Sequence, residues 1–367
     1  MGSVGPTLLR DAFAVPRVRQ DPYALRDLRI WVVGLGMVGQ WLLRAMHSQA
    51  ASLASRHGFV PKVVGVANAR DGFVYDSSGL DLRTVLEFAS ARRSLGELDG
   101  IRSWPSTAEG LAATDADVLV EVTASSADGG EPGVTHMRDA LRRGIPVVTS
   151  NKWPVALNGV ELAELAREKG VPFRAESTVM SGTPVLRALV DGLAGTTPIS
   201  LRGILNATAN FVLTRMEQGA SYADALTEAQ DLGLAERDPT ADVEGYDAMA
   251  KAMILAGLVF ETQLRPGDVA RQGISSVDAS QINAARSGGA RVKELVTLES
   301  SDGSLTARVE PVLLPNHDRL AGVSGVVNAI VCRAEPVGEV MVTGPGAGPE
   351  LAGQGVFSDL IAVAQVR

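Results

Sequence analysis

The segment from Leu234 to Phe260 reads LAERDPTADVEGYDAMAKAMILAGLVF. It begins as a carboxylate-rich loop and continues from about Tyr246 as a predicted helix that is apolar on almost every side. Apolar residues all round a helix are typical of a helix buried in a protein core. We therefore expect this helix to lie inside a domain, with the rest of that domain packed around it.

Two charged residues, Asp247 and Lys251, interrupt the predicted helix. They are four residues apart and so lie on one face. On a surface, such a pair would add only about 0.3–0.5 kcal/mol of stability. Burying both charges is costly unless the surroundings compensate, and perturbed buried pairs often mark functional sites. We interpret Asp247 and Lys251 as a functional pair.

Lysine is rare in this chain, because only five of its 34 basic residues are lysine and the others are arginine. Lysine can release its proton in suitable surroundings, whereas arginine stays charged. A lysine in a buried helix therefore indicates a position that arginine could not serve. Lys152 is a second candidate, because it follows the predicted strand 145–149, and open α/β sheets bind ligands at the carboxyl ends of their strands. Position alone favours this role and a solvated loop lysine equally.

Length and composition restrict the class of protein. A chain of 367 residues with 46% hydrophobic and 21% charged residues predicts a globular protein of two domains. The net charge of −8 argues against nucleic acid or an anionic membrane as a partner. The single Cys332 excludes an intrachain disulfide and a cysteine-based metal site. With no spanning apolar run and no signal-peptide core, we expect a cytoplasmic protein.

A dinucleotide-binding motif lies near the start of the chain. A predicted strand, 28–33, precedes the sequence GLGMVG at 34–39, and a predicted helix follows. This order of strand, glycine turn and helix is the context that makes a GxGxxG motif informative. It predicts that Gly34, Gly36, Met37, Val38 and Gly39 contact a pyrophosphate at the helix N-terminus.

The second strand of this predicted fold bears on the choice of dinucleotide. An NAD-binding fold usually carries an acidic residue at the end of that strand, which binds the ribose 2′-hydroxyl. Here the strand ends in Asn68, followed by Ala69 and Arg70. Arg70 could bind a 2′-phosphate, which favours NADP over NAD, although the adjacent Asp71 weakens this argument.

The remaining pattern predicts an α/β protein with a Rossmann-type domain and a second α+β domain that contains a mixed sheet. We expect an N-terminal arm at 1–26, an NAD(P)-binding domain at 27–155 completed by 344–367, and a substrate-binding and dimerisation domain at 156–343. The second domain would contain helices near 184–193, 210–218 and 222–232, and strands near 199–207, 291–297 and 307–314.

Several motifs together resemble those of homoserine dehydrogenases, across nearly the whole chain from Leu28 to Val366. The long central motif is highly specific, whereas the glycine motif alone is not. The matching segments are GLGMVG (34–39), ADGGEPGVTHMRDAL (127–141), VVTSNKWPVAL (147–157), ESTVMSGTPV (176–185), GILNATANFVLTRM (203–216), LGLAERDPTADVEGYDAMAK (232–251), NAI (328–330) and GPGAG (344–348).

The resemblance implies a role for each matching residue. It makes Asp247 and Lys251 the catalytic pair, with Lys152 contacting both a substrate oxygen and the nicotinamide region. It implies a homodimer and a monovalent cation, sodium or potassium, held largely by carbonyl oxygens. The implied substrate contacts are Glu236, Asp242 and Thr208; the further cofactor contacts are Thr123, Gly346 and Ala347; and the cation ligands are Glu176, Val179, Ser181 and Thr183.

The chemistry of these residues fits the activity that the resemblance implies. Reduction of an aldehyde needs a hydride from NAD(P)H and a proton for the developing alkoxide, which a lysine ammonium could supply. Carboxylates such as Glu236 and Asp242 suit a substrate ammonium group, although a solvated acidic loop would look the same. We expect interconversion of L-aspartate 4-semialdehyde and L-homoserine, on the route to threonine, methionine and isoleucine.

Two departures from the family pattern leave alternatives open. Ala207 stands where the family usually has glycine, and residues 350–355 (ELAGQG) replace its usual Thr-Ala-Ser. A dehydrogenase of another amino alcohol is one alternative, and a dinucleotide-binding regulator without catalysis is the other. The lysines at 152 and 251 argue against the regulator. The chain ends soon after 358–360, so we expect a short form without an ACT or aspartokinase domain.

Overall fold

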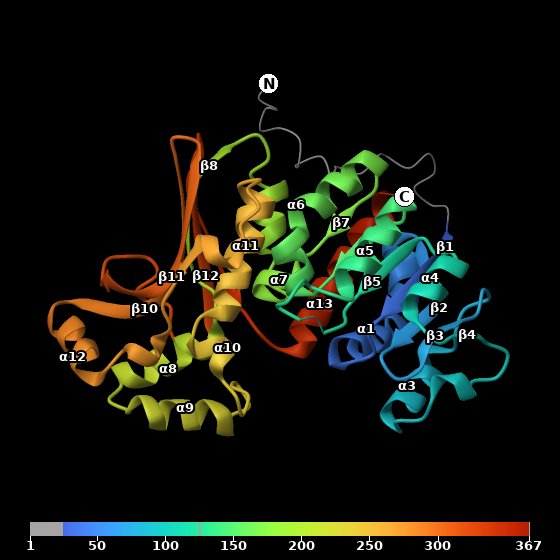
Figure 1. Ribbon diagram of the computed structural model, residues 1–367, viewed down its shortest axis with the longest axis horizontal. Coiled ribbons are helices and arrows are strands. Elements are labelled where there is room, and N and C mark those ends of the chain that lie inside the picture. Colours follow the sequence, from blue (N-terminus) through green and yellow to red (C-terminus); the bar gives the residue numbers. More distant parts are fainter. Residues whose placement is uncertain (1–24, 125, 367) are drawn as a thin grey trace. The chain divides into compact units, whose positions relative to one another are not determined.

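The computed structural model of the protein describes residues 25–124 and 126–366. Most of the expected arm at 1–26 lies outside these residues, and Arg26 already belongs to the first strand. The described chain forms two compact units (Figure 1). The first contains the residues up to Gly182 and from Gly348 onward, and the second contains Thr183–Ala347.

The first unit contains a seven-stranded sheet of order β4-β3-β2-β1-β5-β6-β7. Strands β2, β1, β5, β6 and β7 run parallel, and β3 and β4 extend the β2 edge antiparallel. This topology confirms the predicted Rossmann-type fold, although the sequence did not reveal the edge strands β3 and β4. The bounds are β1 (Arg26–Val33), β2 (Phe59–Asn68), β3 (Gly72–Tyr75), β4 (Arg102–Trp104), β5 (Val118–Glu121), β6 (Val147–Thr149) and β7 (Phe173–Arg174).

Helices cover this sheet. They are α1 (Met37–Ser48), α2 (Ala50–Ser52), the π-helical turn η2 (Leu53–His57), α3 (Leu82–Ser90), the 3₁₀ turn η3 (Leu95–Glu97), α4 (Thr107–Ala113), α5 (Gly133–Arg142), α6 (Lys152–Lys169), α7 (Ser177–Met180) and α13 (Pro349–Val366).

Helix α6 begins at Lys152 and includes Pro154 in its first turn. Pro154 does not prevent this, since proline fits the first turn of a helix, where its missing N–H has no partner to lose. The helix bends at Asn158, which has a φ of −136°. With β7 paired to β6, this segment belongs to the first unit, so the units divide at 182/183 rather than at the expected 155/156.

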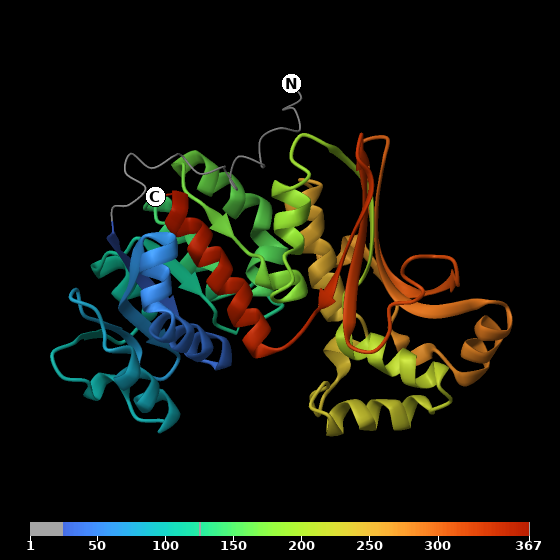
Figure 2. The ribbon, with the colours of Figure 1, turned by 180° about the vertical axis from the view of Figure 1, so that it is seen from behind.

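Helix α13 returns to the first unit and packs against α1, as Figure 2 shows from behind. Two glycines permit this close approach. A methyl group at Gly353 would lie 2.4 Å from the Trp41 ring, and one at Gly355 would lie 2.5 Å from the Ser181 carbonyl oxygen. The 350–355 departure from the family pattern therefore lies within a regular helix, and two of its glycines have a packing role.

The second unit contains a six-stranded mixed sheet of order β13-β12-β8-β10-β11-β9. Only the β9–β11 pair is parallel among its described strand pairs. The prediction of a mixed sheet is thus confirmed. The bounds are β8 (Thr197–Ile204), β9 (Val269–Arg271), β10 (Ala290–Ser301), β11 (Ser304–Pro315), β12 (Val327–Glu335) and β13 (Gly338–Pro345).

The helices predicted near 210–218 and 222–232 are observed, whereas 184–193 contains a π-helical segment rather than a full α-helix. The helices and helical turns of the second unit include one, at Ala279–Ser287, that was not predicted. They are η4 (Arg187–Asp191), α8 (Ala207–Glu217), α9 (Tyr222–Asp231), α10 (Thr240–Val243), α11 (Tyr246–Val259), the 3₁₀ turns η5 (Pro266–Asp268) and η6 (Ile274–Ser276), and α12 (Ala279–Ser287).

Helix α11 is the buried centre that its sequence predicts. Every residue from Ala248 to Val259 is buried, including Lys251. The helix packs against η4 and the strands β9, β10 and β11. This burial gives the Asp247–Lys251 pair the apolar surroundings in which unpaired charges would be costly.

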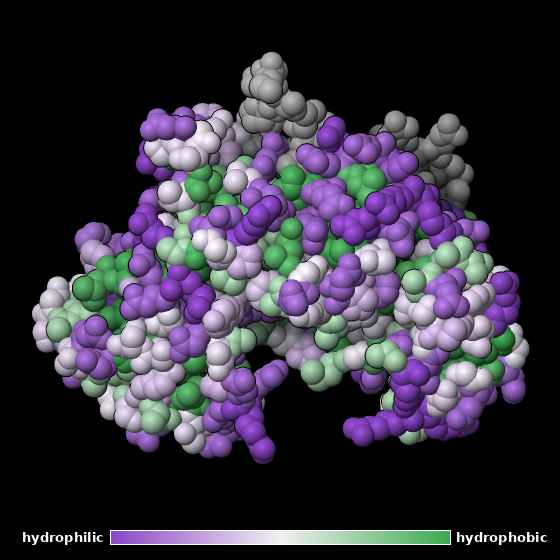
Figure 3. Space-filling model, in the orientation of Figure 1, coloured by the Kyte–Doolittle hydropathy of each residue, from purple (hydrophilic) through white to green (hydrophobic). Residues whose placement is uncertain are grey.

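The outer surface contrasts with these cores. The face in Figure 3 mixes hydrophilic and hydrophobic side chains without sorting them by unit. Within the described residues, no helix combines the length and the apolar character that a membrane span requires.

Gly65 offers a test of packing in the first unit. A methyl group there would lie 2.4 Å from the Phe73 ring and 2.7 Å from the Trp31 ring. We expect Gly65→Ala to lower the free energy of unfolding by about 1–3 kcal/mol, as overpacked cores do. Urea denaturation measures this. Gly96→Ala is the control, because Gly96 is exposed and its nearest neighbour lies at 3.4 Å. Equal midpoints for both variants would contradict the expectation.

Candidate active site

The glycine motif forms a tight turn between β1 and α1. Gly34 has a φ of +111° and donates its N–H to the Ala67 carbonyl. A methyl group at Gly34 would lie 2.6 Å from the Val122 carbonyl group, and one at Gly39 would lie 2.1 Å from the Gly34 oxygen. Gly36, which precedes α1, has open space at its Cβ position. The first and third glycines are thus required by the turn, and the second leaves room for a ligand.

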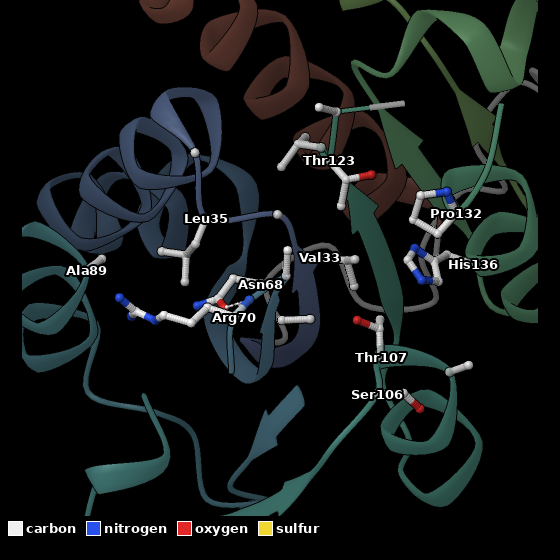
Figure 4. A pocket seen from close by; sticks show the side chains of 17 residues that line it. Val33, Leu35, Asn68, Arg70, Ala89, Ser106, Thr107, Thr123, Pro132 and His136 are labelled. Atoms are coloured by element: carbon white, nitrogen blue, oxygen red, sulfur yellow. Dashed lines mark hydrogen bonds between the residues drawn. The ribbon is translucent and has the colours of Figure 1, made fainter. Parts of the chain in front are cut away.

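A pocket of about 800 Å³ lies beside this turn. It sits where the strand order reverses around β1, which is the position at which open α/β sheets bind nucleotides. Figure 4 shows Leu35 and Arg70 on one side and Pro132 and His136 on the other. The lining residues are Val33–Gly36, Ala67–Arg70, Ala89, Ser106–Ala108, Val122–Ala124, Pro132 and His136.

Five of the predicted cofactor contacts line this pocket: Gly34, Gly36, Asn68, Arg70 and Thr123. The others do not line it. Met37 and Val38 lie in the first turn of α1 with Gly39, and Met37 is exposed. Gly346 and Ala347 belong to the second unit, so their proposed role is not tested by this pocket.

The Arg70 guanidinium is already engaged at the end of β2. It donates to both carboxylate oxygens of Asp71 and to the carbonyls of Arg92 and Arg93. Asn68 donates to the same carboxylate at 2.8 Å and accepts from the Arg70 N–H. Although burial alone would raise it, these hydrogen bonds hold the pKa of Asp71 well below its usual range. Arg70 is therefore paired with a carboxylate rather than left for a phosphate.

Glu121, which the sequence analysis did not single out, organises the other side of the pocket. It is completely buried at the end of β5. Its carboxylate accepts from the Thr123 hydroxyl and, at 2.9 Å, from the Asn151 amide. The His136 Nδ1 lies 3.7 Å away. One acidic residue closing an apolar strand, VLVE, was the signal that could have revealed it.

Lys152 begins α6 directly after Asn151 and is partly buried. The expected cation ligands lie along 176–183. Glu176 is buried beside the one-turn helix α7, and Ser181 has a φ of +50°. A helix of one turn leaves its carbonyls without helical partners, which suits carbonyl ligation of a cation. Thr183 already belongs to the second unit, so the full ligand set stays a prediction.

In the second unit, α11 holds the ammonium of Lys251 between two oxygens. Its Nζ lies 2.8 Å from Asp247 Oδ2 and donates to the Leu205 carbonyl at 2.6 Å. Lys251 is only 6% exposed, so these partners compensate for the water that the ammonium loses. The sequence-based interpretation of a buried pair thus matches the geometry.

Asn206 joins a further carboxylate to this pair. It caps α8, where its Oδ1 accepts from the Ala209 N–H at 2.8 Å. Its Nδ2 donates to Asp242 Oδ1 at 2.7 Å and to Asp247 Oδ2 at 3.0 Å. One amide therefore holds both acids in place, and the sequence analysis did not single out this residue.

The remaining substrate candidates, Thr208 and Glu236, differ in how they are held in the structure. Thr208, on the first turn of α8, donates to the Leu234 carbonyl at 2.8 Å, which ties the carboxylate-rich loop to α8. Glu236 is exposed on that loop and is not drawn into the hydrogen bonds around Asp247. Ala207 is the first residue of α8, so its backbone is helical and does not need glycine.

Asn328, on β12, was also missed by the sequence analysis. It is completely buried and donates to the Leu205 carbonyl at 2.8 Å, the same oxygen that accepts from Lys251. Gly346 packs against it, because a methyl group at that glycine would lie 2.0 Å from the Asn328 amide nitrogen.

Comparisons with known proteins agree with both units. The family model for the homoserine dehydrogenase NAD-binding domain matches residues 34–176, and that for homoserine dehydrogenase itself matches residues 184–361. The NAD(+)-dependent homoserine dehydrogenase of Pseudomonas canavaninivorans is 39% identical over 342 residues, which cover 93% of this chain and 97% of the relative.

The chain belongs to the homoserine dehydrogenase family. It is therefore an NAD(P)-dependent oxidoreductase. A homoserine dehydrogenase from Thiobacillus denitrificans is 30% identical, with a TM-score of 0.79 over 94% of this chain and 74% of that one. A hyperthermophilic archaeal homoserine dehydrogenase in complex with NADPH is also 30% identical, with a TM-score of 0.76 over 91% and 97%.

We expect substitutions at the third and second glycines of the turn to have different effects. Gly39→Ala should destabilise the first unit by about 1–3 kcal/mol, because its methyl group meets the Gly34 oxygen. Gly36→Ala should leave the thermal midpoint unchanged but weaken dinucleotide binding about tenfold, since its methyl group enters the pocket. Calorimetry and binding titrations separate the two effects. If both variants lost thermal stability and dinucleotide affinity to the same extent, the two glycines would not have these separate roles.

Proposed function

We propose that the enzyme interconverts L-homoserine and L-aspartate 4-semialdehyde, in agreement with its similarity to homoserine dehydrogenases. The observation that most supports this is the Lys251 ammonium, buried in α11 and bonded to Asp247 and the Leu205 carbonyl. Such a group is suited to meet the substrate's reacting oxygen.

Each of these groups has a separate role in the proposed reaction. A bound nicotinamide supplies hydride-transfer chemistry, for which the pocket beside the glycine turn is suited. In the reductive direction, Lys251 stabilises the negative charge that develops on the carbonyl oxygen and delivers a proton to it. Asp247 orients this ammonium from one helical turn away. Lys152 would contact the same region of the substrate from its place at the start of α6.

Recognition of an amino acid requires a site for its ammonium group. We assign this role to Asp242, with Glu236 from the adjoining loop and Thr208 from α8. Asp242 is held by Asn206, which pre-orients its carboxylate. A fixed carboxylate loses little conformational freedom when it meets a cation, which favours binding.

Substitution of Lys251 tests its catalytic role. We expect Lys251→Ala to reduce kcat for homoserine by roughly 10²–10⁴-fold while leaving dinucleotide affinity unchanged, because the pocket lies in the other unit. Steady-state kinetics and dinucleotide titration measure both. Lys62→Ala is the matched control, because Lys62 forms a half-exposed pair with Asp27. Normal turnover by Lys251→Ala would remove this residue from the mechanism, and a better amino-alcohol substrate in a panel would change the assigned reaction.

For the dinucleotide, the hydrogen bonds of Arg70 lead us to propose NAD rather than the NADP that its sequence position favoured. A 2′-phosphate would have to compete with Asp71 and two carbonyls for the guanidinium. It would also approach the buried Asp71 carboxylate. The name of the Pseudomonas relative supports NAD, whereas the archaeal complex contains NADPH.

Replacement of Asp71 tests this preference. Asp71→Asn removes the charge that occupies Arg70, so kcat/KM with NADP should rise about tenfold relative to NAD. Initial rates with each dinucleotide give the ratio. Glu97→Gln is the control, since Glu97 pairs with Arg93 instead. A parent enzyme that already prefers NADP, or an unchanged ratio in Asp71→Asn, would refute the proposal.

The remaining family-based expectations stay proposals. They are a sodium or potassium ion near 176–183, a homodimer, a cytoplasmic location, and a place in the biosynthesis of threonine, methionine and isoleucine. The buried Glu176 and the carbonyls after α7 support the ion.

A further inference from the structure

The strand β10 carries a buried carboxyl group, Glu294, that no step above uses. Its residue is 3% exposed, and its Oε1 has no hydrogen-bond partner among the described residues. Buried polar groups are normally paired, because an unpaired one loses its hydration without compensation. An unpaired carboxyl oxygen in a core therefore requires an explanation.

Glu294 lies next to the centre formed by Asp242, Asp247 and Lys251. Its Oε1 faces Gly245, where a methyl group would lie 3.4 Å from it. Gly245 connects α10, which carries Asp242, to α11, which carries Asp247. Helix α11 also packs against β10. The carboxyl group thus lies against the turn between the two acids that Asn206 holds.

The surroundings of Glu294 disfavour the ionised form of its carboxyl group. Burial raises the pKa of this carboxyl to about 8, and repulsion from Asp247 and Asp242 adds to the effect, while Lys251 opposes it. The carboxyl is therefore largely protonated at neutral pH. In that form it adds no negative charge to a centre that already contains two carboxylates and one ammonium.

Other charged groups near β10 are occupied by different partners. From β9, Arg271 reaches the same Gly245 turn, but its guanidinium donates to the Glu244 carbonyl and lies 3.7 Å from the Tyr246 ring centre. On β11, the residue opposite Glu294 is the uncharged Pro311.

The charges on α8 and α12 gather elsewhere. Glu217 of α8 pairs with Lys293 and Arg291, and it lines a separate pocket with Arg286 of α12. Arg202 of β8 pairs with Asp318. The cationic charge of a ligand near Asp242 would therefore act on Glu294 alongside Lys251, and it would favour the ionised carboxyl.

We propose that Glu294 is a positioning residue that tunes this site to a substrate bearing an ammonium group, by releasing its proton to solvent when that cation binds beside Asp242 and Asp247. The proposal rests on the function proposed above. An empty site with a protonated Glu294 avoids a third buried negative charge. A site occupied by a cation gains a third carboxylate in the region that faces the cation, which strengthens binding of the amino substrate.

The first experiment tests the proton without any substrate. A carboxyl whose pKa is raised on folding binds more protons in the folded protein, so stability falls as the pH rises from about 4.5 through about 8. The thermal midpoint of the parent should therefore decline across this range more steeply than that of Glu294→Gln or of Glu294→Leu. Glu299→Gln is the control, because Glu299 is exposed on the same strand and pairs with Arg308.

The second experiment measures kinetics with homoserine. From about pH 6.5 to about pH 8.5, KM of the parent should fall several-fold, because proton release favours cation binding, while kcat changes less. Glu294→Gln should lose this dependence of KM, and Glu299→Gln should keep it. Inhibition by a hydroxy acid that lacks the amino group should show no such dependence in either protein.

The outcomes separate the two proposals. No turnover of homoserine by the parent would overturn the proposed function, and the midpoint series would still decide whether Glu294 holds a proton. Turnover with the same pH dependence of KM in the parent and Glu294→Gln would overturn the role of Glu294 alone. Equal midpoint slopes in the parent, Glu294→Gln and Glu294→Leu would also overturn it.

Discussion

An ammonium group inside an apolar helix is the constraint on which the second unit depends. Lys251 can remain charged at 6% exposure only because oxygens replace its lost water. Asp247 supplies one of these oxygens, and the Leu205 carbonyl supplies another. The residue after β8, the cap of α8 and the first turn of α11 therefore meet at this point.

The two units use polar groups differently. In the first, the glycine turn leaves room for a ligand in the pocket beside the end of β1. Side chains such as Glu121 support it from behind through Thr123 and Asn151. In the second, the centre consists of charged side chains linked by one amide, Asn206. The first arrangement suits a phosphate, which prefers helix N-termini, and the second suits a charged amino acid.

The sequence predicted the elements whose pattern extends over consecutive residues. The apolar character of 248–259 and the strand, turn and helix around 28–46 each extend over consecutive residues, so periodicity found them. Glu294 was not found, because Lys293 and Glu294 are adjacent and so lie on opposite faces of the strand, and only tertiary packing shows that both faces are covered. Asn206 and Asn328 were missed for a similar reason, since their partners lie 36 to 123 residues away. The hydrogen bonds of Arg70 to carbonyls 22 and 23 residues away likewise cannot be read from the motif at the end of β2.

The carbonyl of Leu205 accepts from both Lys251 and Asn328, and it belongs to the main chain. Genetic variation replaces side chains and leaves the peptide group in place, so no substitution at codon 205 short of proline, whose ring would alter the local backbone, can delete this acceptor. Substitutions elsewhere can displace this carbonyl only indirectly, by changing how β8 is aligned with its neighbouring strands. Of the two oxygens that hold the buried amine, the Leu205 carbonyl thus depends on the fold of the main chain, whereas the Asp247 carboxylate depends on a single residue.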